Sequence, residues 1–254
     1  MKPKSLRIAW QLLQPIRSVR VKDAVKLPKV YNQFFNDLRE YRRLDKFARL
    51  EDLQPCLFDR NFATQSGGGH YFFQDVWALK RIADAKPLEH HDVGSRLDGF
   101  VGQATAICPV IFWDIRPVSI RLPNFTFRHG CLTDLPIPNQ SIRSISCLHV
   151  VEHVGLGRYG DSIDPLGTEK ALTELMRVLA VGGQLLISLP IGKERVCFNG
   201  QRISHPDKPL DLLNELTLLE FSAVTDVGEF VEAAPLAAFV KSKNSCGLYR
   251  FTRK

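Results

Sequence analysis

Two aspartates and a glycine stand at the ends of two apolar segments, at a spacing that can bind a ligand. The first segment runs into His91-Asp92-Val93-Gly94-Ser95, and the second ends at Asp114. Asp114 follows Gly94 by 20 residues, a spacing at which an acid beside a glycine turn accepts hydrogen bonds from ribose hydroxyls. The glycine lets a ligand approach the backbone. Asp92 could instead accept backbone N–H bonds at the next helix, whereas a strand end gives Asp114 few structural roles.

A second group of reactive residues, His149-Val150-Val151-Glu152-His153, follows the apolar run Ser144–Leu148. Imidazole titrates near neutral pH, so His149 or His153 could remove a proton from a substrate hydroxyl. Alternatively, Glu152 and His153 only cap and orient the turn.

The same five residues match the His-x-x-Glu-His motif of inverted metalloproteases, in which both histidines bind zinc. That chemistry needs both imidazoles one helical turn apart, and His149 closes a strand-like run. We therefore predict no metal ligand. A zinc hydrolase that uses His149, Glu152 and His153 stays as an alternative.

Alternating strands and helices must position these residues. The expected strands are Leu88–Val93, Val110–Ile115, Phe125–His129, Ser144–Val150 and Gln184–Leu189, with helices at Arg96–Gln103 and Thr168–Leu179. This order predicts a doubly wound α/β fold with a mostly parallel sheet, because such strands are buried on both faces. Two further strands are expected at Thr217–Val224 and Gly247–Thr252, the last at an edge or in a hairpin.

The positive charge of the chain is confined to its N-terminal part. Residues 1–50 hold 13 Lys or Arg against 4 Asp or Glu, whereas the rest holds 21 against 23. We predict a basic helical extension over residues 1–65, with a helix from Lys29 to Phe47, and an α/β domain over residues 66–254. The basic residues either form a solvated helical face or meet an anionic membrane surface. A nucleic-acid partner is not expected, and the oligomeric state is left open.

Glycines Gly67–Gly69 precede a helix expected over Asp75–Ala85. With His70 and Tyr71 they either close over a ligand or form a tight turn, and no strand precedes them as a phosphate loop requires. His205 could meet a substrate, although a histidine in a surface loop is the simpler interpretation.

Composition points to the cytoplasm. No apolar run approaches the roughly 20 residues that cross a bilayer, and the N-terminus lacks the apolar core of a signal peptide. None of the six cysteines lies two or three residues from another, so the spacing indicates neither a zinc knuckle nor a redox pair. We expect a cytoplasmic protein that is not secreted and that could lie at the inner face of the membrane.

The central part of the chain resembles a known family. Its motifs are Gly130-Cys131-Leu132-Thr133-Asp134-Leu135-Pro136, then the His149–His153 turn, then Gly182-Gly183 before Leu185–Pro190. They resemble class I methyltransferases that depend on S-adenosylmethionine, over roughly residues 66–254. Gly68–Tyr71 and Ser204–Pro209 also resemble a sparse methyltransferase-like family of unassigned function, whose members are often associated with surface-polysaccharide gene clusters.

The resemblance implies a Rossmann-like fold and methyl transfer from S-adenosylmethionine to a hydroxyl of a sugar or another small acceptor. The methionine end of the cofactor would meet Asp92, Gly94 and Ser95, and the ribose would meet Asp114. The adenine would lie near Cys131 and Leu132, and the sulfonium above His149, which faces the substrate. The catalytic candidates are His149, His153 and Glu152.

Three residues depart from the pattern of the family. Arg96 replaces a glycine, Cys131 replaces an acid that accepts from the adenine amine, and Arg143 replaces an aspartate. These departures favour an alternative: an inactive methyltransferase-like binding module that joins a glycan-assembly complex to the membrane.

Overall fold

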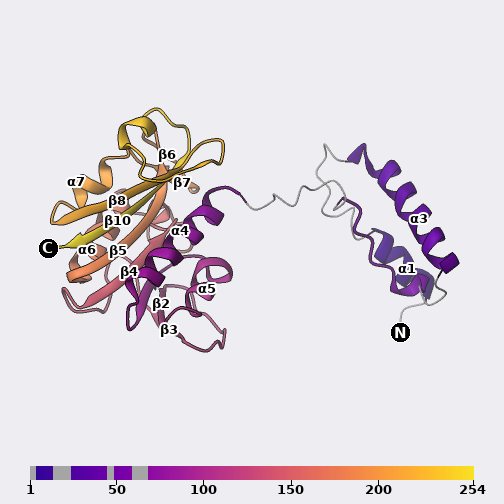
Figure 1. Ribbon diagram of the computed structural model, residues 1–254, viewed down its shortest axis with the longest axis horizontal. Coiled ribbons are helices and arrows are strands. Elements are labelled where there is room, and N and C mark those ends of the chain that lie inside the picture. Colours follow the sequence, from indigo (N-terminus) through magenta and orange to yellow (C-terminus); the bar gives the residue numbers. More distant parts are fainter. Residues whose placement is uncertain (1–3, 14–23, 45–48, 59–67) are drawn as a thin grey trace. The chain divides into compact units, whose positions relative to one another are not determined.

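The computed structural model describes residues 4–13, 24–44, 49–58 and 68–254. The chain divides into two compact units, Met1–Ser66 and Gly67–Lys254 (Figure 1).

In the first unit, helix α1 spans Lys4–Leu13, helix α3 spans Leu27–Leu44 and a 3-10 turn (η2) spans Leu50–Asp52. The end of the helix predicted from Lys29 to Phe47 falls on residues 45–47, which lie outside the described residues. No residue of α3 is buried. Within the part of the chain that the structure describes, no helix is both long and apolar enough to pass through a bilayer.

The second unit is built on an eight-stranded sheet with the order β3-β2-β1-β4-β5-β10-β8-β9. The first five of these strands are parallel to one another: β3 (Phe125–His129), β2 (Val110–Asp114), β1 (His90–Val93), β4 (Ile142–Leu148) and β5 (Leu179–Ile191). The rest pair antiparallel: β10 (Ser245–Arg253), β8 (Leu216–Val224) and β9 (Phe230–Val231). A separate hairpin joins β6 (Arg195–Cys197) and β7 (Gln201–Ile203). The predicted doubly wound, mostly parallel fold is confirmed.

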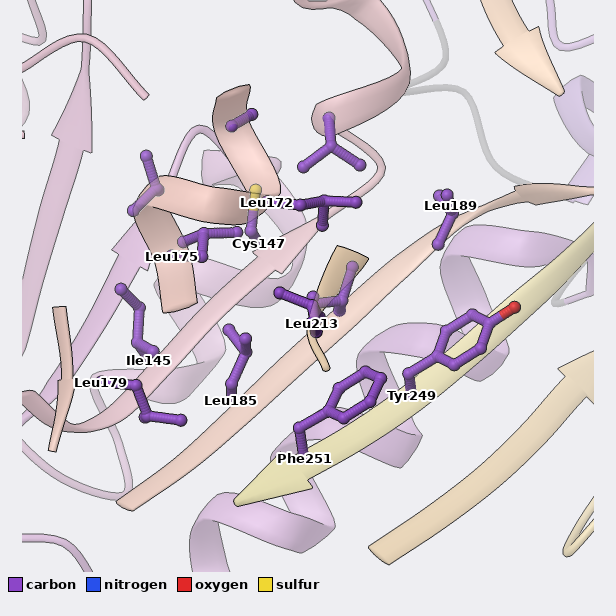
Figure 2. Packing of buried hydrophobic residues seen from close by; sticks show 14 of the residues in the cluster. Ile145, Cys147, Leu172, Leu175, Leu179, Leu185, Leu189, Leu213, Tyr249 and Phe251 are labelled. Atoms are coloured by element: carbon purple, nitrogen blue, oxygen red, sulfur yellow. The ribbon is translucent and has the colours of Figure 1, made fainter. Parts of the chain in front are cut away.

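Helices cover both faces of the sheet because alternate residues of each strand point to opposite faces. One face packs on α6 (Gly167–Val178) and α7 (Lys208–Leu212), and the other packs on α4 (His70–Ala85) and α5 (Gly102–Ala104) (Figure 1). On β10, Tyr249 and Phe251 face the α6 side (Figure 2), whereas Leu248 faces the α4 side. Each fully buried large apolar side chain contributes about 1.5–3 kcal/mol to folding.

Of the two places expected for the last strand, the edge of the sheet is wrong. Strand β10 does not lie at an edge, because it pairs with β5 on one side and with β8 on the other. Its register sets Ser245 opposite Ile191, the last residue of β5. The beginning of β10 therefore lies at the same edge of the sheet as the carboxyl ends of β4 and β5.

The helix predicted over Arg96–Gln103 is also different from the structure. A π-helical turn (η5) spans Leu97–Val101 and only α5 follows it as an α-helix. Such turns occur frequently at functional sites.

Helix α4 begins earlier than predicted, at His70 rather than at Asp75. Gly69 precedes it with a φ of 87°, a conformation that glycine adopts without strain. Further along, Trp77 Nε1 donates to Glu220 Oε1 at 2.9 Å, and Arg81 forms an ion pair with the same carboxylate. Because Glu220 belongs to β8, these contacts fix the helix to the sheet and so position His70 and Tyr71.

Candidate functional site

A pocket of about 480 Å³ opens at the carboxyl ends of β1, β2 and β4. Strand order reverses here, because β1 has β2 on one side and β4 on the other. Ligands of open α/β sheets bind at such a point. The predicted site residues that line the pocket are Gly94, Ser95, Asp114, Cys131, Leu132, His149 and His153.

The turn after β1 brings backbone to the edge of the pocket. Gly94 has a φ of 74°, and a Cβ added there would lie 2.9 Å from Val150 Cγ1. Both observations mean that any residue larger than glycine would be strained at this position. Next to it, the Ser95 hydroxyl accepts from Leu148 N at 2.9 Å, which ties this turn to the end of β4.

Asp92 lies in a different position from the one expected, because it does not border the pocket. Its side chain is fully buried, and Oδ1 and Oδ2 accept from Ser95 N at 3.0 Å and Ser95 Oγ at 2.7 Å. Ser146 Oγ also donates to Oδ2. Burial raises the pKa of Asp92 to about 7, although these hydrogen bonds oppose the shift. Asp92 therefore organises the turn that carries Gly94 and Ser95.

Asp114 borders the pocket at the end of β2, and Arg116 already occupies its carboxylate. Arg116 donates to Oδ1 from Nε at 2.9 Å and from its backbone N at 2.8 Å, and to Oδ2 from Nη2 at 2.7 Å. The Asp114 side chain is 6% exposed, whereas that of Arg116 is 51% exposed. A carboxylate offers about four lone-pair sites, so one site stays open while Arg116 is bound, and further sites open when its exposed side chain turns away.

Arg96, at the position where the resemblance implied a glycine, causes no backbone strain. Its φ and ψ are −61° and 120°, an ordinary extended conformation. The side chain pairs with Asp98 at 3.1 Å, and its guanidinium lies 5.0 Å from the centre of the Tyr71 ring. Arg96 and Tyr71 both line the pocket, so this cation–π pair forms part of its wall.

The other two departures lie in different places. Cys131 lines the pocket beside the buried Leu132, and its Sγ lies 3.2 Å from Thr133 Oγ1. Arg143 is exposed on β4 and does not line the pocket. Of the two, only Cys131 can affect a ligand directly, as a weak acceptor.

His149 follows β4 in a left-handed conformation, with a φ of 55°. Such a conformation is uncommon for a residue other than glycine and concentrates at functional sites. The side chain is 5% exposed, and its Nδ1 lies 3.1 Å from Glu152 Oε1. Burial favours the neutral ring, but the adjacent Cys246 and Glu152 raise the pKa of His149 well above its ordinary value.

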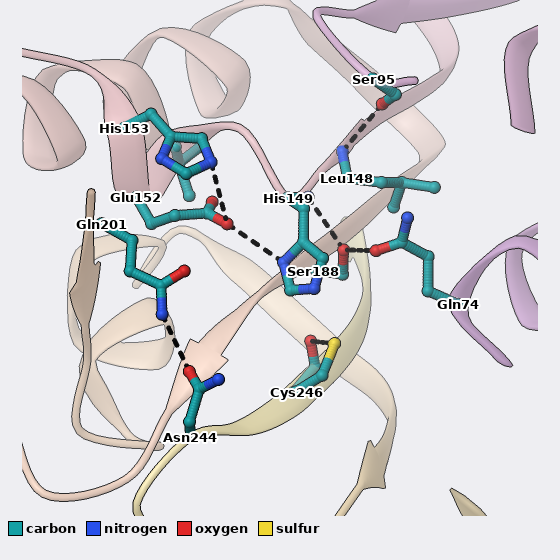
Figure 3. Close-up of polar contacts among 12 residues, drawn as sticks. Gln74, Ser95, Leu148, His149, Glu152, His153, Ser188, Gln201, Asn244 and Cys246 are labelled. Atoms are coloured by element: carbon teal, nitrogen blue, oxygen red, sulfur yellow. Dashed lines mark hydrogen bonds and ion pairs between the residues drawn. The ribbon is translucent and has the colours of Figure 1, made fainter. Parts of the chain in front are cut away.

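Glu152 lies between the two imidazoles of the motif (Figure 3) and does not border the pocket. Its Oε1 is 3.1 Å from His149 Nδ1 and 3.7 Å from His153 Nε2. These nitrogens face the carboxylate, and the 3-10 turn Val151–His153 (η6) gives them no common helical face. The zinc geometry of an inverted metalloprotease is therefore not formed by His149 and His153.

The group of His149, Glu152 and His153 contains buried polar atoms without hydrogen bonds. His149 Nδ1 and Glu152 Oε2 both lack a partner of hydrogen-bonding geometry, although the ion-pair distance of 3.1 Å is short. Unsatisfied buried groups are uncommon in folded proteins, and each requires an explanation.

His153 is held by the hairpin that follows β5. Its Nδ1 lies 2.7 Å from the Gly200 carbonyl and 3.4 Å from Arg158 Nη1. The carbonyl contact is shorter, so we place the proton on Nδ1, which leaves the Nε2 lone pair free. Burial lowers the pKa of His153 despite the adjacent Glu152, which keeps the ring neutral near pH 7.

A buried polar chain fixes the backbone of His149. Ser188 Oγ accepts from His149 N at 3.0 Å and donates to Gln74 Oε1 at 2.5 Å (Figure 3). Gln74 in turn donates to Asp75 at 3.0 Å. Strand β5 and helix α4 therefore both support the turn after β4.

The remaining candidates divide between pocket and surface. Tyr71 reaches the pocket, whereas Gly68 and Gly69 form the turn before α4; Gly67 lies outside the described residues. His205 does not line the pocket and faces Asp207 at 3.5 Å in a loop.

Sequence reasoning missed Arg116, Arg158 and Tyr159. Both guanidiniums lie within 5.1 Å of the Tyr159 ring centre, and Tyr159 and Arg116 line the pocket. The position of Arg116 two residues after Asp114 is the signal that could have revealed it.

Comparison with known proteins shows one family match and a widely shared fold. Residues 139–223 match a family model described as Caenorhabditis protein of unknown function, DUF268, which covers less than half of the chain. No curated protein sequence matches the chain.

Three solved structures illustrate the fold. N-methyltransferase NodS from Bradyrhizobium japonicum WM9, in complex with S-adenosyl-L-homocysteine, is 14% identical with a TM-score of 0.50, over 72% of this chain and 87% of that one. Geranyl diphosphate methyltransferase in complex with SAM is 13% identical with a TM-score of 0.51, over 71% and 85%. The [4+2]-cyclase SpnF is 12% identical with a TM-score of 0.51, over 70% and 81%.

The chain therefore has the fold of class I S-adenosylmethionine-dependent methyltransferases. At these identities the likeness concerns the fold. Two of these proteins are named as methyltransferases and one as a cyclase, and a fold does not by itself fix a reaction.

Proposed function

We propose that this protein transfers a methyl group from S-adenosylmethionine to a hydroxyl of a small acceptor such as a sugar. The observation that carries the proposal is the pocket at the switch point, with the Gly94 turn and the Asp114 carboxylate at its edge. Its volume of about 480 Å³ is within the usual range for small-molecule sites, roughly 300–1,000 Å³.

The residues present fit the cofactor. Gly94 lets the methionine end approach the backbone, where a Cβ would collide with Val150. Asp114 offers a free lone pair to a ribose hydroxyl, and Leu132 an apolar surface to the adenine. Cys131 supplies no strong acceptor to the adenine amine, a loss of about 1 kcal/mol. S-adenosylmethionine brings a methyl group on a reactive sulfonium, so the task of the protein is alignment.

The second histidine of the motif acts on the acceptor. His153 is the base, because its neutral ring borders the pocket. After it takes the hydroxyl proton, the Nε2–H faces Glu152 Oε1, 3.7 Å away, and that carboxylate stabilises the imidazolium. His149 borders the pocket beside it, and its Nδ1 faces the same carboxylate at 3.1 Å.

Calorimetric titration with S-adenosylmethionine and with S-adenosylhomocysteine tests the cofactor. We expect binding of both, and Asp114→Ala to weaken it at least about tenfold, because each hydrogen bond to a charged group contributes about 1.5–3 kcal/mol. Asp84→Ala is the matched control, since Asp84 is exposed on α4 and does not line the pocket. Absence of heat with either ligand at millimolar concentration would overturn the proposal.

Turnover tests the base. With an accepted sugar, His153→Asn should lower kcat about 10²–10⁴-fold, the usual contribution of general base catalysis, while binding of the cofactor stays within about twofold. An unchanged kcat would remove His153 from the mechanism.

A second candidate function is a binding module that holds the nucleotide without transferring a methyl group. The Arg116–Asp114 pair and Cys131 favour it, because both reduce what the pocket offers to the cofactor. In this case the basic helices of residues 1–65 would attach the module to anionic lipid. Equal sedimentation with neutral and anionic liposomes would exclude that attachment.

A further inference from the structure

Three residues that are far apart in the sequence meet beside the pocket. His70 begins α4, His149 follows β4 and Cys246 is the second residue of β10. One possible ligand atom from each lies within 4.8 Å of the other two, and in the described part of the chain this is the one such group of His, Cys, Asp and Glu residues. His149 and Cys246 are buried and His70 is half-buried.

The fold brings these residues together through the antiparallel pairing of β10. Cys246 lies opposite Pro190 of β5, and Ser188 of the same strand lies opposite Leu148 of β4. His149 follows Leu148 directly. The cysteine of the last strand therefore reaches the turn after β4 across one strand, without any closeness in sequence.

The dimensions suit a zinc ion after a small adjustment. Zinc–nitrogen bonds of about 2.0–2.1 Å and zinc–sulfur bonds of about 2.3 Å place tetrahedral ligand atoms roughly 3.4–3.7 Å apart. From a separation of at most 4.8 Å, side-chain rotations of about 1 Å close the site. Two histidines and a cysteine form a soft, mixed ligand set that selects zinc over magnesium or calcium.

Independent support comes from the surroundings of His149. Metal-binding histidines commonly direct their other ring nitrogen to a carboxylate, which fixes the tautomer. His149 directs Nδ1 to Glu152 Oε1 at 3.1 Å, and Figure 3 shows its other ring nitrogen on the side of Cys246. Nδ1 has no hydrogen bond of normal geometry, and rotation of the ring onto a metal would allow that bond to form.

The backbone around all three residues is held firmly. Ser188 and Gln74 tie His149 to α4, close to His70. On the other side, Asp226 accepts from Lys243 N and Asn244 N, both at 2.8 Å, and from Ser245 Oγ at 3.0 Å, just before Cys246. Metal sites require such support to hold the geometry of their ligands.

We propose that His70, His149 and Cys246 bind one zinc ion beside the pocket, with Glu152 orienting His149. The ligand set leaves the fourth coordination position for water or an acceptor oxygen, as in catalytic zinc sites. His149 borders the pocket, so the ion would lie at its margin on the acceptor side. The proposal is separate from methyl transfer, because it concerns metal binding by the chain itself.

Metal binding is tested on the full-length protein, freed of metal and then titrated with Co²⁺ and Zn²⁺. We expect one Co²⁺ per chain with a thiolate-to-metal charge-transfer band, which Zn²⁺ displaces, and one zinc per chain by elemental analysis. Cys246→Ser should abolish the band, and His70→Ala should weaken binding at least about 100-fold. Glu152→Gln should weaken it about 10–100-fold, as substitutions of carboxylates behind a ligand do.

Cys108→Ser is the matched control, because Cys108 is also a buried free cysteine but lies outside the cluster. Circular dichroism shows whether each variant folds, and His70→Ala keeps the test decisive if Cys246→Ser does not fold, since His70 is half-buried. Less than stoichiometric binding at tens of micromolar metal, or equal binding by wild type and His70→Ala, would overturn the proposal. Cofactor titrations on the same samples separate this result from failure of the proposed methyl transfer.

Discussion

Two carboxylates near the same pocket have opposite surroundings. Asp114, at the end of β2, is paired with an arginine that is half exposed to solvent. Glu152, after β4, is 1% exposed and lies between two buried histidines, with one oxygen unsatisfied. Arg116 is exposed to solvent, so the Asp114 carboxylate can exchange its partner. The region around Glu152 is buried in the core.

The two regions therefore make different demands on the residues that form them. The Gly94 turn and Asp114 border the pocket, and they need only offer lone pairs and space to a ligand. His70, His149, Glu152 and Cys246 form a mostly buried cluster beside it, and buried polar groups of this kind carry large energetic consequences.

Unfolding experiments on variants of both carboxylates give the strongest test of this difference. Glu152→Ala should lower the free energy of unfolding by about 3–5 kcal/mol, because it removes the partner of a buried charged group. Asp114→Ala should cost less than about 1 kcal/mol, because Arg116 is then solvated. Denaturant titration measures both, and similar small losses of unfolding free energy would show that the region around Glu152 is accessible to solvent.

Asp92 sharpens the comparison, because it is as buried as Glu152 but has satisfied oxygens. Its pKa is about 7 in the folded protein, against 3.8 ordinarily. The folded state therefore binds the proton more tightly, and the contribution of Asp92 to stability is full below pH 4 and falls as the pH rises to 7. The total is up to roughly 4 kcal/mol.

Asp92→Asn removes this titration while it keeps the shape of the side chain. The unfolding free energy of the wild type minus that of Asp92→Asn should fall between pH 5 and pH 7 and become constant above about pH 8. A constant difference across this range would show that Asp92 is ionised in the fold at all of these pH values.

The two regions also differ in how far the sequence could predict them. Asp114 was found because a parallel strand buried on both faces has a clear end, and the acid stands at that end. The position of β10 could not be found in the same way, because antiparallel pairing with β5 and β8 is decided by packing in three dimensions. Cys246 was therefore missed as a neighbour of His149, although the His149–Glu152 motif itself was recognised.

Side-chain pairing was a further limit. The spacing from Gly94 to Asp114 predicted an acceptor for ribose, and the carboxylate does border the pocket. Its pairing with Arg116 depends on a rotamer and on the Tyr159 ring beside it, neither of which leaves a pattern in the sequence.

Arg116 gives the smallest expected effect and the most direct test of the exchangeable region. If it competes with ribose for Asp114, Arg116→Gln should tighten binding of S-adenosylhomocysteine by up to about fivefold, because a solvent-exposed ion pair contributes at most about 1 kcal/mol. Arg158→Gln is the control, since Arg158 also lies beside Tyr159 but bonds Gly200 rather than Asp114. Weaker binding by Arg116→Gln alone would mean that the arginine contacts the ligand. The region around Asp114 would then be built as specifically as the region around Glu152.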